Sequence, residues 1–134
     1  MSSLQKQARF IHVGLSVSDI DRSIAWYEHH FGCRVTKRFE KPELEIKGVV
    51  LQFDTVIFEI LQPYKSCKTQ EPTGSLIEEL RYLGANHIAI GVGDVAKCYE
   101  TFKDAGCEMV TQLIGGKLFF CKDPDGTLIE VKQN

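Results

Sequence analysis

Two histidines and two glutamates occupy matching places in the two halves of this 134-residue chain. His12 and His87 lie at the beginning of two similar strand-like runs, FIHVGLSV and NHIAIGV. Glu59 and Glu130 lie in two later apolar runs, VIFEIL and LIEV, near the end of each half. Imidazole and carboxylate groups can together hold a divalent metal ion. The four residues therefore predict a metal site, and they favour an enzyme over a generic globular domain.

Each of these residues also has a purely structural interpretation. A lone histidine on a strand is more often an ordinary buried residue than a metal ligand, and a glutamate on an amphipathic strand can simply face solvent. The matched positions of His12 and His87, each followed by a glutamate, favour metal binding. A glutamate in the middle of IFEIL would be costly to bury without a partner, and a metal ion would supply one.

The two halves are related by internal similarity. A shift of 75 positions pairs His12 with His87, and a shift of 74 pairs the Gly-Cys of residues 32–33 with that of residues 106–107. Each half has a strand starting at the histidine, a turn with aspartate, an amphipathic helix and β-rich sequence ending at the glutamate. We expect one domain over residues 1–134, with a first module at about 8–62, a linker and short helix at 63–84, and a second module at about 85–132.

Hydrophobic spacing predicts one long helix in each half. Ser18 is the predicted N-cap of the first helix, and Gly32 is suited to its C-terminal end. The apolar stripes consist of Ile20, Ile24, Tyr27 and Phe31 in the first half and of Val95, Tyr99 and Phe102 in the second. A short helix is expected at 74–83, and strands near 34–41, 46–53, 55–62, 107–113, 116–122 and 127–132.

Side chains alternate between two unlike faces along the first strand of each half. One face is aliphatic and is expected to be covered by a helix. The other face begins with His12 or His87 and continues with small residues, namely Gly14 and Ser16 in the first strand and Ala89 and Gly91 in the second. Small residues leave space, so the histidine-bearing face is expected to line a cleft.

Composition and charge exclude several classes of function. The net charge of −2 argues against a nucleic-acid-binding protein, and no apolar run approaches the ~18 residues of a membrane span. The first ten residues, MSSLQKQARF, lack the apolar core of a signal peptide, and the five cysteines include no CxxC pair. We expect a cytoplasmic protein with reduced thiols that acts on a small molecule, without nucleic-acid or membrane partners.

Three strings together resemble the vicinal oxygen chelate superfamily: HVGLSVSDIDRSIAWYEHHFG, NHIAIGVGDV and KDPDGTLIEV. That group includes glyoxalase I, methylmalonyl-CoA epimerase, extradiol dioxygenases, and the bleomycin and fosfomycin resistance proteins. The resemblance covers residues 10–132 and implies an α+β fold of tandem βαβββ modules, whose curved mixed sheets form a cup around a metal, in a homodimer. It also implies one divalent ion (Zn, Ni, Co, Mn or Fe) whose ligands are His12, Glu59, His87 and Glu130.

The ligand set also bears on the function that the resemblance implies. Four ligand-competent positions are similar to those of glyoxalase I and the epimerase, whereas the dioxygenases and thiol-transferring resistance proteins resemble a three-ligand arrangement. The implied function is a lactoylglutathione lyase-like lyase or isomerase that moves a proton next to a metal-bound carbonyl. Glu130 is the favoured catalytic base, Glu59 is the second candidate, and Glu45 is a further alternative. The alternative functions are an epimerase, an extradiol dioxygenase or antibiotic-resistance transferase, and a non-enzymatic drug-binding protein.

Overall fold

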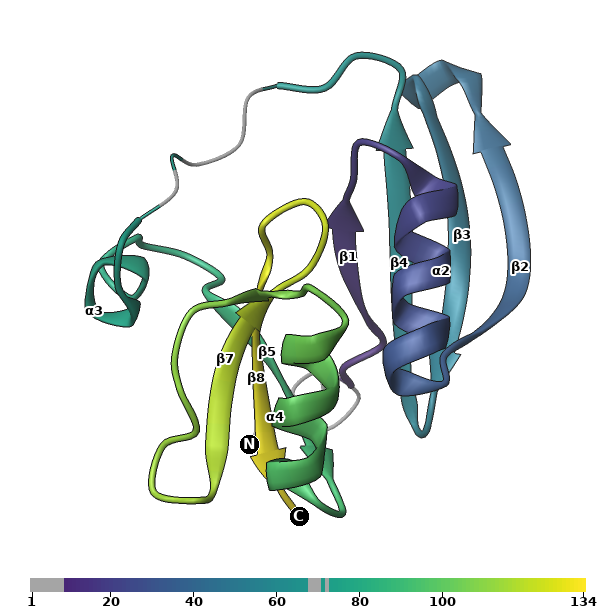
Figure 1. Ribbon diagram of the computed structural model, residues 1–134. Helices are drawn as coiled ribbons and strands as arrows, with labels where there is room; N and C mark the ends of the chain where they lie inside the picture. Colours follow the sequence, from purple (N-terminus) through teal and green to yellow (C-terminus); the bar gives the residue numbers. More distant parts are fainter. Residues whose placement is uncertain (1–8, 68–70, 72) are drawn as a thin grey trace, which may run out of the picture. The chain divides into compact units, whose positions relative to one another are not determined.

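The computed structural model describes residues 9–67, 71 and 73–134 (Figure 1). The chain divides into two compact units, Met1–Ser66 and Cys67–Asn134. Each unit contains one four-stranded sheet and one principal helix. Among the residues described, no helix is long and apolar enough to cross a membrane.

The sheet of the first unit has the strand order β1-β4-β3-β2. Its strands are β1 (His12–Ser16), β2 (Arg34–Lys41), β3 (Ile46–Phe53) and β4 (Val56–Pro63). The helix α2 (Ile20–Phe31) connects β1 to β2, and the short 3-10 turn η1 (Pro42–Leu44) precedes β3. Strand β1 pairs with β4 in parallel, whereas the other two pairings are antiparallel. Parallel neighbours need a crossover connection, which α2 and the β2–β3 hairpin together provide.

The second unit repeats this topology in the order β5-β8-β7-β6. Its strands are β5 (His87–Val92), β6 (Glu108–Met109), β7 (Leu118–Lys122) and β8 (Leu128–Gln133). The helix α4 (Val95–Asp104) follows β5, and the one-turn helix α3 (Leu76–Glu79) precedes it. Strands β5 and β8 again pair in parallel. The predicted α+β class with tandem βαβββ modules is therefore confirmed.

One helix covers one face of each sheet, and aromatic contacts dominate both packings. In the first unit the fully buried Tyr27 of α2 meets Phe58 of β4 edge to face, with ring centroids 5.7 Å apart. In the second unit Phe102 of α4 makes the same kind of contact with Phe119 of β7, also at 5.7 Å. Such pairs add roughly 0.5–1.5 kcal/mol to the stabilisation from burying the rings. The opposite face of each sheet, which carries the histidine and the glutamate, is left uncovered by the helix of its own unit.

The N-caps of the two helices are aspartates. Asp19 accepts a hydrogen bond from the Arg22 amide at 3.1 Å, and Asp94 accepts one from the Lys97 amide at 3.1 Å. The prediction of Ser18 as N-cap was wrong, because Asp19 is the extended residue directly before the helix and its carboxylate reaches the third amide. The predicted end of the first helix is confirmed, since its C-cap Gly32 has φ 70°.

A glutamine from the last strand of each unit also bonds to the first turn of the helix. The Gln62 side chain of β4 accepts from the Ile20 amide at 2.8 Å, and the Gln133 side chain of β8 accepts from the Val95 amide at 3.1 Å. Each bond satisfies one of the amides that a helix leaves without an internal partner. The two glutamines lie three residues after Glu59 and Glu130, so they belong to the repeat.

Three elements are shorter than the sequence predicted, and the smallest difference is in β7, which covers Leu118–Lys122 rather than 116–122. Strand β6 covers Glu108–Met109 rather than residues 107–113. The strand ends early because the Phe120 amide donates its hydrogen bond to the Thr111 hydroxyl, where a backbone carbonyl would accept it in a continued strand. Helix α3 covers Leu76–Glu79 rather than 74–83. Leu83 is 99% exposed, so a further turn would bury little apolar surface to stabilise it.

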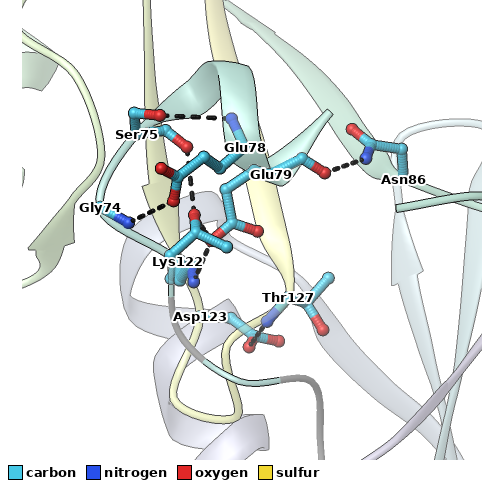
Figure 2. A network of polar contacts seen from close by, with 9 residues as sticks. Gly74, Ser75, Glu78, Glu79, Asn86, Lys122, Asp123 and Thr127 are labelled. Atoms are coloured by element: carbon cyan, nitrogen blue, oxygen red, sulfur yellow. Dashed lines mark hydrogen bonds and ion pairs between the residues drawn. The ribbon is translucent and has the colours of Figure 1, made fainter. Parts of the chain in front are cut away.

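A buried ion pair attaches α3 to the end of β7 (Figure 2). The Lys122 ammonium lies 2.5 Å from Glu79 Oε1, and both side chains are 8% exposed. The Thr73 hydroxyl donates a second hydrogen bond to the same oxygen at 2.8 Å. Burial alone raises the pKa of Glu79, but the hydrogen bonds from Lys122 and Thr73 outweigh it and lower that pKa below the ordinary value of a glutamate. Glu79 is therefore ionised in the folded protein at neutral pH.

We expect Lys122→Met to reduce the free energy of unfolding by about 3–5 kcal/mol, because it leaves the Glu79 carboxylate buried without its cation. Urea denaturation at neutral pH measures this, and Lys117→Met, at an exposed position, is the matched control with a change within about 0.5 kcal/mol. The pKa of Glu79 is lower in the folded protein than in the unfolded chain. The ionised carboxylate therefore adds to the free energy of unfolding above the ordinary glutamate pKa, and this contribution is lost as pH falls through the folded pKa. The difference in the free energy of unfolding between wild type and Lys122→Met should therefore decrease in acid. Equal stability of the two proteins at neutral pH would contradict the prediction.

Candidate functional site

The first unit brings His12 and Glu59 together on the exposed face of its sheet. In the parallel ladder Gly14 pairs with Glu59, so His12 lies two residues along β1 from the point opposite the glutamate. His12 Nε2 is 3.7 Å from Glu59 Oε2, and the two side chains are 41% and 28% exposed.

The second unit builds the same pair with the same offset. Ala89 pairs with Glu130, and His87 again lies two residues earlier on β5. His87 Nε2 is 3.4 Å from Glu130 Oε1, with side-chain exposures of 30% and 16%. The Phe120 ring of β7 packs against the His87 ring edge to face at 5.4 Å. This second pair is thus less exposed to solvent than the first.

Both pairs have the chemistry and the spacing of two ligands on one ion. Two atoms bound to a single metal at about 2.0–2.2 Å each lie no more than about 4.4 Å apart, and the observed separations of 3.4 and 3.7 Å meet that limit. One imidazole nitrogen and one carboxylate oxygen suit the first-row divalent ions. Each unit therefore presents one pair of side chains that could bind a metal ion.

The structure brings the four predicted residues together as two pairs, one in each unit. Among the described residues there is no cluster of three or more His, Cys, Asp or Glu side chains gathered to hold an ion. A site that combines both pairs stays a prediction from the repeat.

A β-bulge determines which side chains of β2 share the exposed face with His12 and Glu59. Val35 pairs with Leu51 and Lys37 pairs with Val50, so Thr36 is an extra residue between them. The extra residue reverses the alternation, which is a common way for a bulge to redirect side chains beside a site. Lys37 lies in the same row of the sheet as Glu59, because Val50 pairs with both.

The same reversal places an aromatic ring and a second lysine on this face. The Phe39 ring lies over Gly48, where it leaves no room for a Cβ atom, and the Lys41 ammonium sits 5.4 Å from the centre of that ring. Arg34, which pairs with Gln52 before the bulge, also belongs to this face. The described strand residues of this face thus include three cations on the edge strand β2 and the single carboxylate Glu59.

Arg38 and Glu40 are turned to the other face by the bulge. Arg38 lies 3.9 Å from Asp21 of α2, and Glu40 accepts a hydrogen bond from the Tyr64 hydroxyl. Glu45, the alternative base, lies in the turn before β3 with φ 54°. Its neighbour Ile46 pairs with Pro63, which lies four residues after Glu59 on β4. Glu45 is therefore near the far end of β4 and away from the His12–Glu59 pair.

The two buried cysteines, Cys33 and Cys121, are poor candidates for a catalytic nucleophile. Burial raises the pKa of the Cys33 thiol to about 11 and that of the Cys121 thiol to about 12. Both groups are therefore protonated at neutral pH, and a protonated thiol is a poor nucleophile.

Asn86 is a functional candidate that sequence reasoning missed. Its side-chain oxygen lies 2.8 Å from His87 Nδ1, on the opposite edge of the ring from Glu130. The only signal in the sequence was its position directly before a predicted ligand, and the first half has Ile11 at the equivalent place.

The family model described as Glyoxalase/Bleomycin resistance protein/Dioxygenase superfamily matches residues 9–131. A probable lactoylglutathione lyase of Vibrio parahaemolyticus is 30% identical over 94% of this chain and 91% of its own length. A putative lactoylglutathione lyase of Brassica oleracea var. gemmifera is also 30% identical, and the match covers 93% of this chain but only 44% of that longer protein.

Among solved structures, a glyoxalase I of Leishmania major described as trypanothione-dependent superposes with a TM-score of 0.75. It is 28% identical, and the match covers 95% of this chain and 87% of that one. These comparisons confirm the resemblance that the three sequence strings indicated.

Proposed function

The chain belongs to the Glyoxalase/Bleomycin resistance protein/Dioxygenase superfamily, and from this membership we propose that it is a metal-dependent lyase of the lactoylglutathione lyase type. The observation that carries the proposal is the repeated His–Glu pair, at 3.7 Å in one unit and 3.4 Å in the other. Relatives that bear the lyase name match 92% or more of this chain.

The proposed cofactor is one divalent ion, drawn from Zn, Ni, Co, Mn and Fe. Its ligands would be His12, Glu59, His87 and Glu130, two from each unit, whether the units belong to one chain or to two. Such an ion supplies Lewis-acid polarisation of a substrate carbonyl, which acidifies the neighbouring C–H bond. The donor set fits this role, because it combines two neutral imidazoles with two carboxylates.

The proposed reaction is an internal proton transfer in a hemithioacetal. Glu130 takes the proton from the carbon that carries the sulfur and the hydroxyl, and returns it to the neighbouring carbonyl carbon. The hydroxyl proton passes to the oxygen of that carbonyl, so the first carbon becomes the thioester carbonyl and the second carries the new hydroxyl. Atoms and electrons balance, because the product 2-hydroxy thioester is an isomer of the substrate. Glu130 is favoured over Glu59 because its side chain is 16% rather than 28% exposed, which shields the transferred proton from water. Return of a proton to the opposite face of the same carbon would instead make the enzyme an epimerase.

The exposed face of the first unit favours an anionic substrate. Lys37 and Lys41 flank the Phe39 ring beside Glu59, and the described strand residues of that face offer them no carboxylate other than Glu59. A cationic wall raises the local concentration of anions and their rate of association. A glutathione-type conjugate carries free carboxylates and an uncharged central portion, which suits lysines arranged around an aromatic ring.

The proposal also includes a homodimer and a cytoplasmic location. Strands β1 and β2 are the edges of the first sheet as the described residues form it, and a second copy could cover such edges. All five cysteines are free thiols, as expected in a reducing compartment.

We expect Glu130→Gln to lower turnover by roughly 10²–10⁴-fold, because an amide cannot accept the proton. It should retain part of the metal affinity, since the amide oxygen can still coordinate. Glu59→Gln should have the milder effect if Glu59 acts mainly as a ligand. Elemental analysis gives the bound metal, and solvent-deuterium incorporation into hemithioacetals and 2-substituted acyl thioesters gives the proton transfer.

Glu100→Gln, the same change at an exposed position of α4, is the matched control and should leave metal content and turnover unchanged. Purified protein that binds no divalent metal would refute the proposed function. Exchange and turnover at the wild-type level in both Glu130→Gln and Glu59→Gln would exclude both as the base and direct attention to the Glu43–Glu45 segment. Metal binding with aromatic ring cleavage or thiol transfer to an antibiotic would favour the dioxygenase or transferase.

We expect the double variant Lys37→Gln/Lys41→Gln to raise KM for the glutathione hemithioacetal about 10-fold with little change in kcat, because the lysines attract the substrate without touching its reacting atoms. The KM for a hemithioacetal of an uncharged thiol should not change. Arg38→Gln on the other face is the control, and steady-state kinetics at two salt concentrations is the measurement. An equal effect on charged and uncharged substrates would argue against an electrostatic role.

We expect the protein to sediment as a species of about twice the 15.1 kDa chain mass at micromolar concentration. Analytical ultracentrifugation over a tenfold concentration range makes this measurement. A single species of chain mass throughout the range would exclude the homodimer.

A further inference from the structure

We infer that Asn86 is a positioning residue that holds His87 in the tautomer protonated on Nδ1 and thereby leaves Nε2 as the metal-binding nitrogen. The tautomer itself follows from hydrogen bonding in the second unit alone. Its consequence for metal affinity rests on the proposed function, because that proposal makes His87 a ligand.

The direction of the Asn86 hydrogen bonds determines the tautomer. The Asn86 Nδ2 group donates to the backbone carbonyl of Glu79 at 2.9 Å (Figure 2). A backbone carbonyl can only accept, so the amide nitrogen must face Glu79 and the amide oxygen must face His87. That oxygen lies 2.8 Å from His87 Nδ1, within hydrogen-bond distance. The competing acceptor is the Glu130 carboxylate, which lies farther away, at 3.4 Å from Nε2, so the shorter contact places the proton on Nδ1. In a neutral imidazole the other nitrogen, Nε2, then carries the free lone pair.

The nitrogen with the free lone pair is the one that faces Glu130. His87 Nε2 is the atom that lies 3.4 Å from Glu130 Oε1. The Phe120 ring packs edge to face on His87 and further restricts the plane of the imidazole. The ring is thus held by a hydrogen bond on one edge and by an aromatic contact, while its metal-binding nitrogen stays accessible.

Asn86 is in turn held by a well-anchored helix. The carbonyl that it binds belongs to Glu79, whose side chain forms the buried ion pair with Lys122 of β7. The N-cap Ser75 fixes the other end of α3 by accepting from the Glu78 amide at 3.2 Å (Figure 2). The short helix therefore gives Asn86 a fixed acceptor at its amide nitrogen.

The first unit has no counterpart of this arrangement in its sequence. The 75-residue shift that pairs the histidines places Ile11 opposite Asn86, and an aliphatic side chain cannot accept a proton from His12. The two halves of the proposed metal site therefore differ in preorganisation. A partner on the second ring nitrogen typically contributes 10–100-fold to metal affinity.

The test begins with the metal-free protein, at about pH 8, where an ordinary histidine is neutral. Long-range ¹H–¹⁵N NMR spectra distinguish the two tautomers of each ring. We expect His87 in the Nδ1–H form in wild type. Asn86→Leu should release it toward the Nε2–H form that free histidine prefers, whereas Asn86→Asp, which keeps an acceptor oxygen, should preserve Nδ1–H. A merely structural role for Asn86 would not produce this pattern.

The second measurement is metal affinity, by titration of Zn²⁺ alone against a competing chelator. We expect Asn86→Leu to weaken binding 10–100-fold and Asn86→Asp to restore most of it, whereas Ile11→Leu, the matched change in the first unit, should leave it unchanged. If Asn86→Leu does not fold, the wild-type tautomer still decides the inference.

The outcomes separate this inference from the proposed function. A wild-type His87 in the Nε2–H form would overturn the inference even if the protein binds metal. A wild-type His87 in the Nδ1–H form that reverts in Asn86→Leu would support the positioning role even if Zn²⁺ does not bind, in which case only the proposed function fails. If the wild-type protein binds Zn²⁺ and Asn86→Leu binds it with unchanged affinity, Asn86 does not prepare His87 for metal binding, and that part of the inference is wrong.

Discussion

The parallel pairing of the first and last strand in each unit is the constraint on which the rest of the structure depends. It places a histidine near the start of one strand beside a glutamate near the middle of the other, although 47 residues separate His12 from Glu59 and 43 separate His87 from Glu130. Because parallel neighbours require a crossover, the helix and the intervening hairpin exist in each unit to make that pairing possible. The helix then covers one face of the sheet, and the His–Glu pair is left on the other.

The two units share this backbone frame and use it differently. Behind the second pair lies a chain of contacts that runs from Glu130 through His87 and Asn86 to the buried Glu79–Lys122 pair. Beside the first pair lies the bulged strand β2, which turns Lys37 and Phe39 toward the same face as Glu59. One unit thus holds its histidine in a fixed orientation, and the other supplies charge and an aromatic surface. In the function that we propose, the second unit orients a metal ligand and the first attracts the substrate.

The sequence predicted the features that depend on local patterns and on the repeat. The strand at 34–41, the helix end at Gly32 and both His–Glu pairs follow from alternation, backbone preference and internal similarity. It did not predict the bulge at Thr36, because one extra residue in a strand leaves no mark in a run of polar residues. The Glu79–Lys122 pair was also missed, since two charged residues 43 positions apart look like ordinary surface residues until the fold buries them. A side chain in place of a ladder bond, as at Thr111, is equally invisible in the sequence.

The glutamines that follow the two glutamates have a consequence for how this chain can change in evolution. Along β4 and β8 a carboxylate for one face and a helix-capping amide for the other are separated by three positions. Deleting or inserting a single residue between them would turn one of the two to the wrong side of the sheet, since neighbouring strand positions face opposite ways. These strands can therefore accept substitutions but not changes of length. Length variation among descendants of this duplication should concentrate in connections such as residues 110–117, where the chain has already left the ladder.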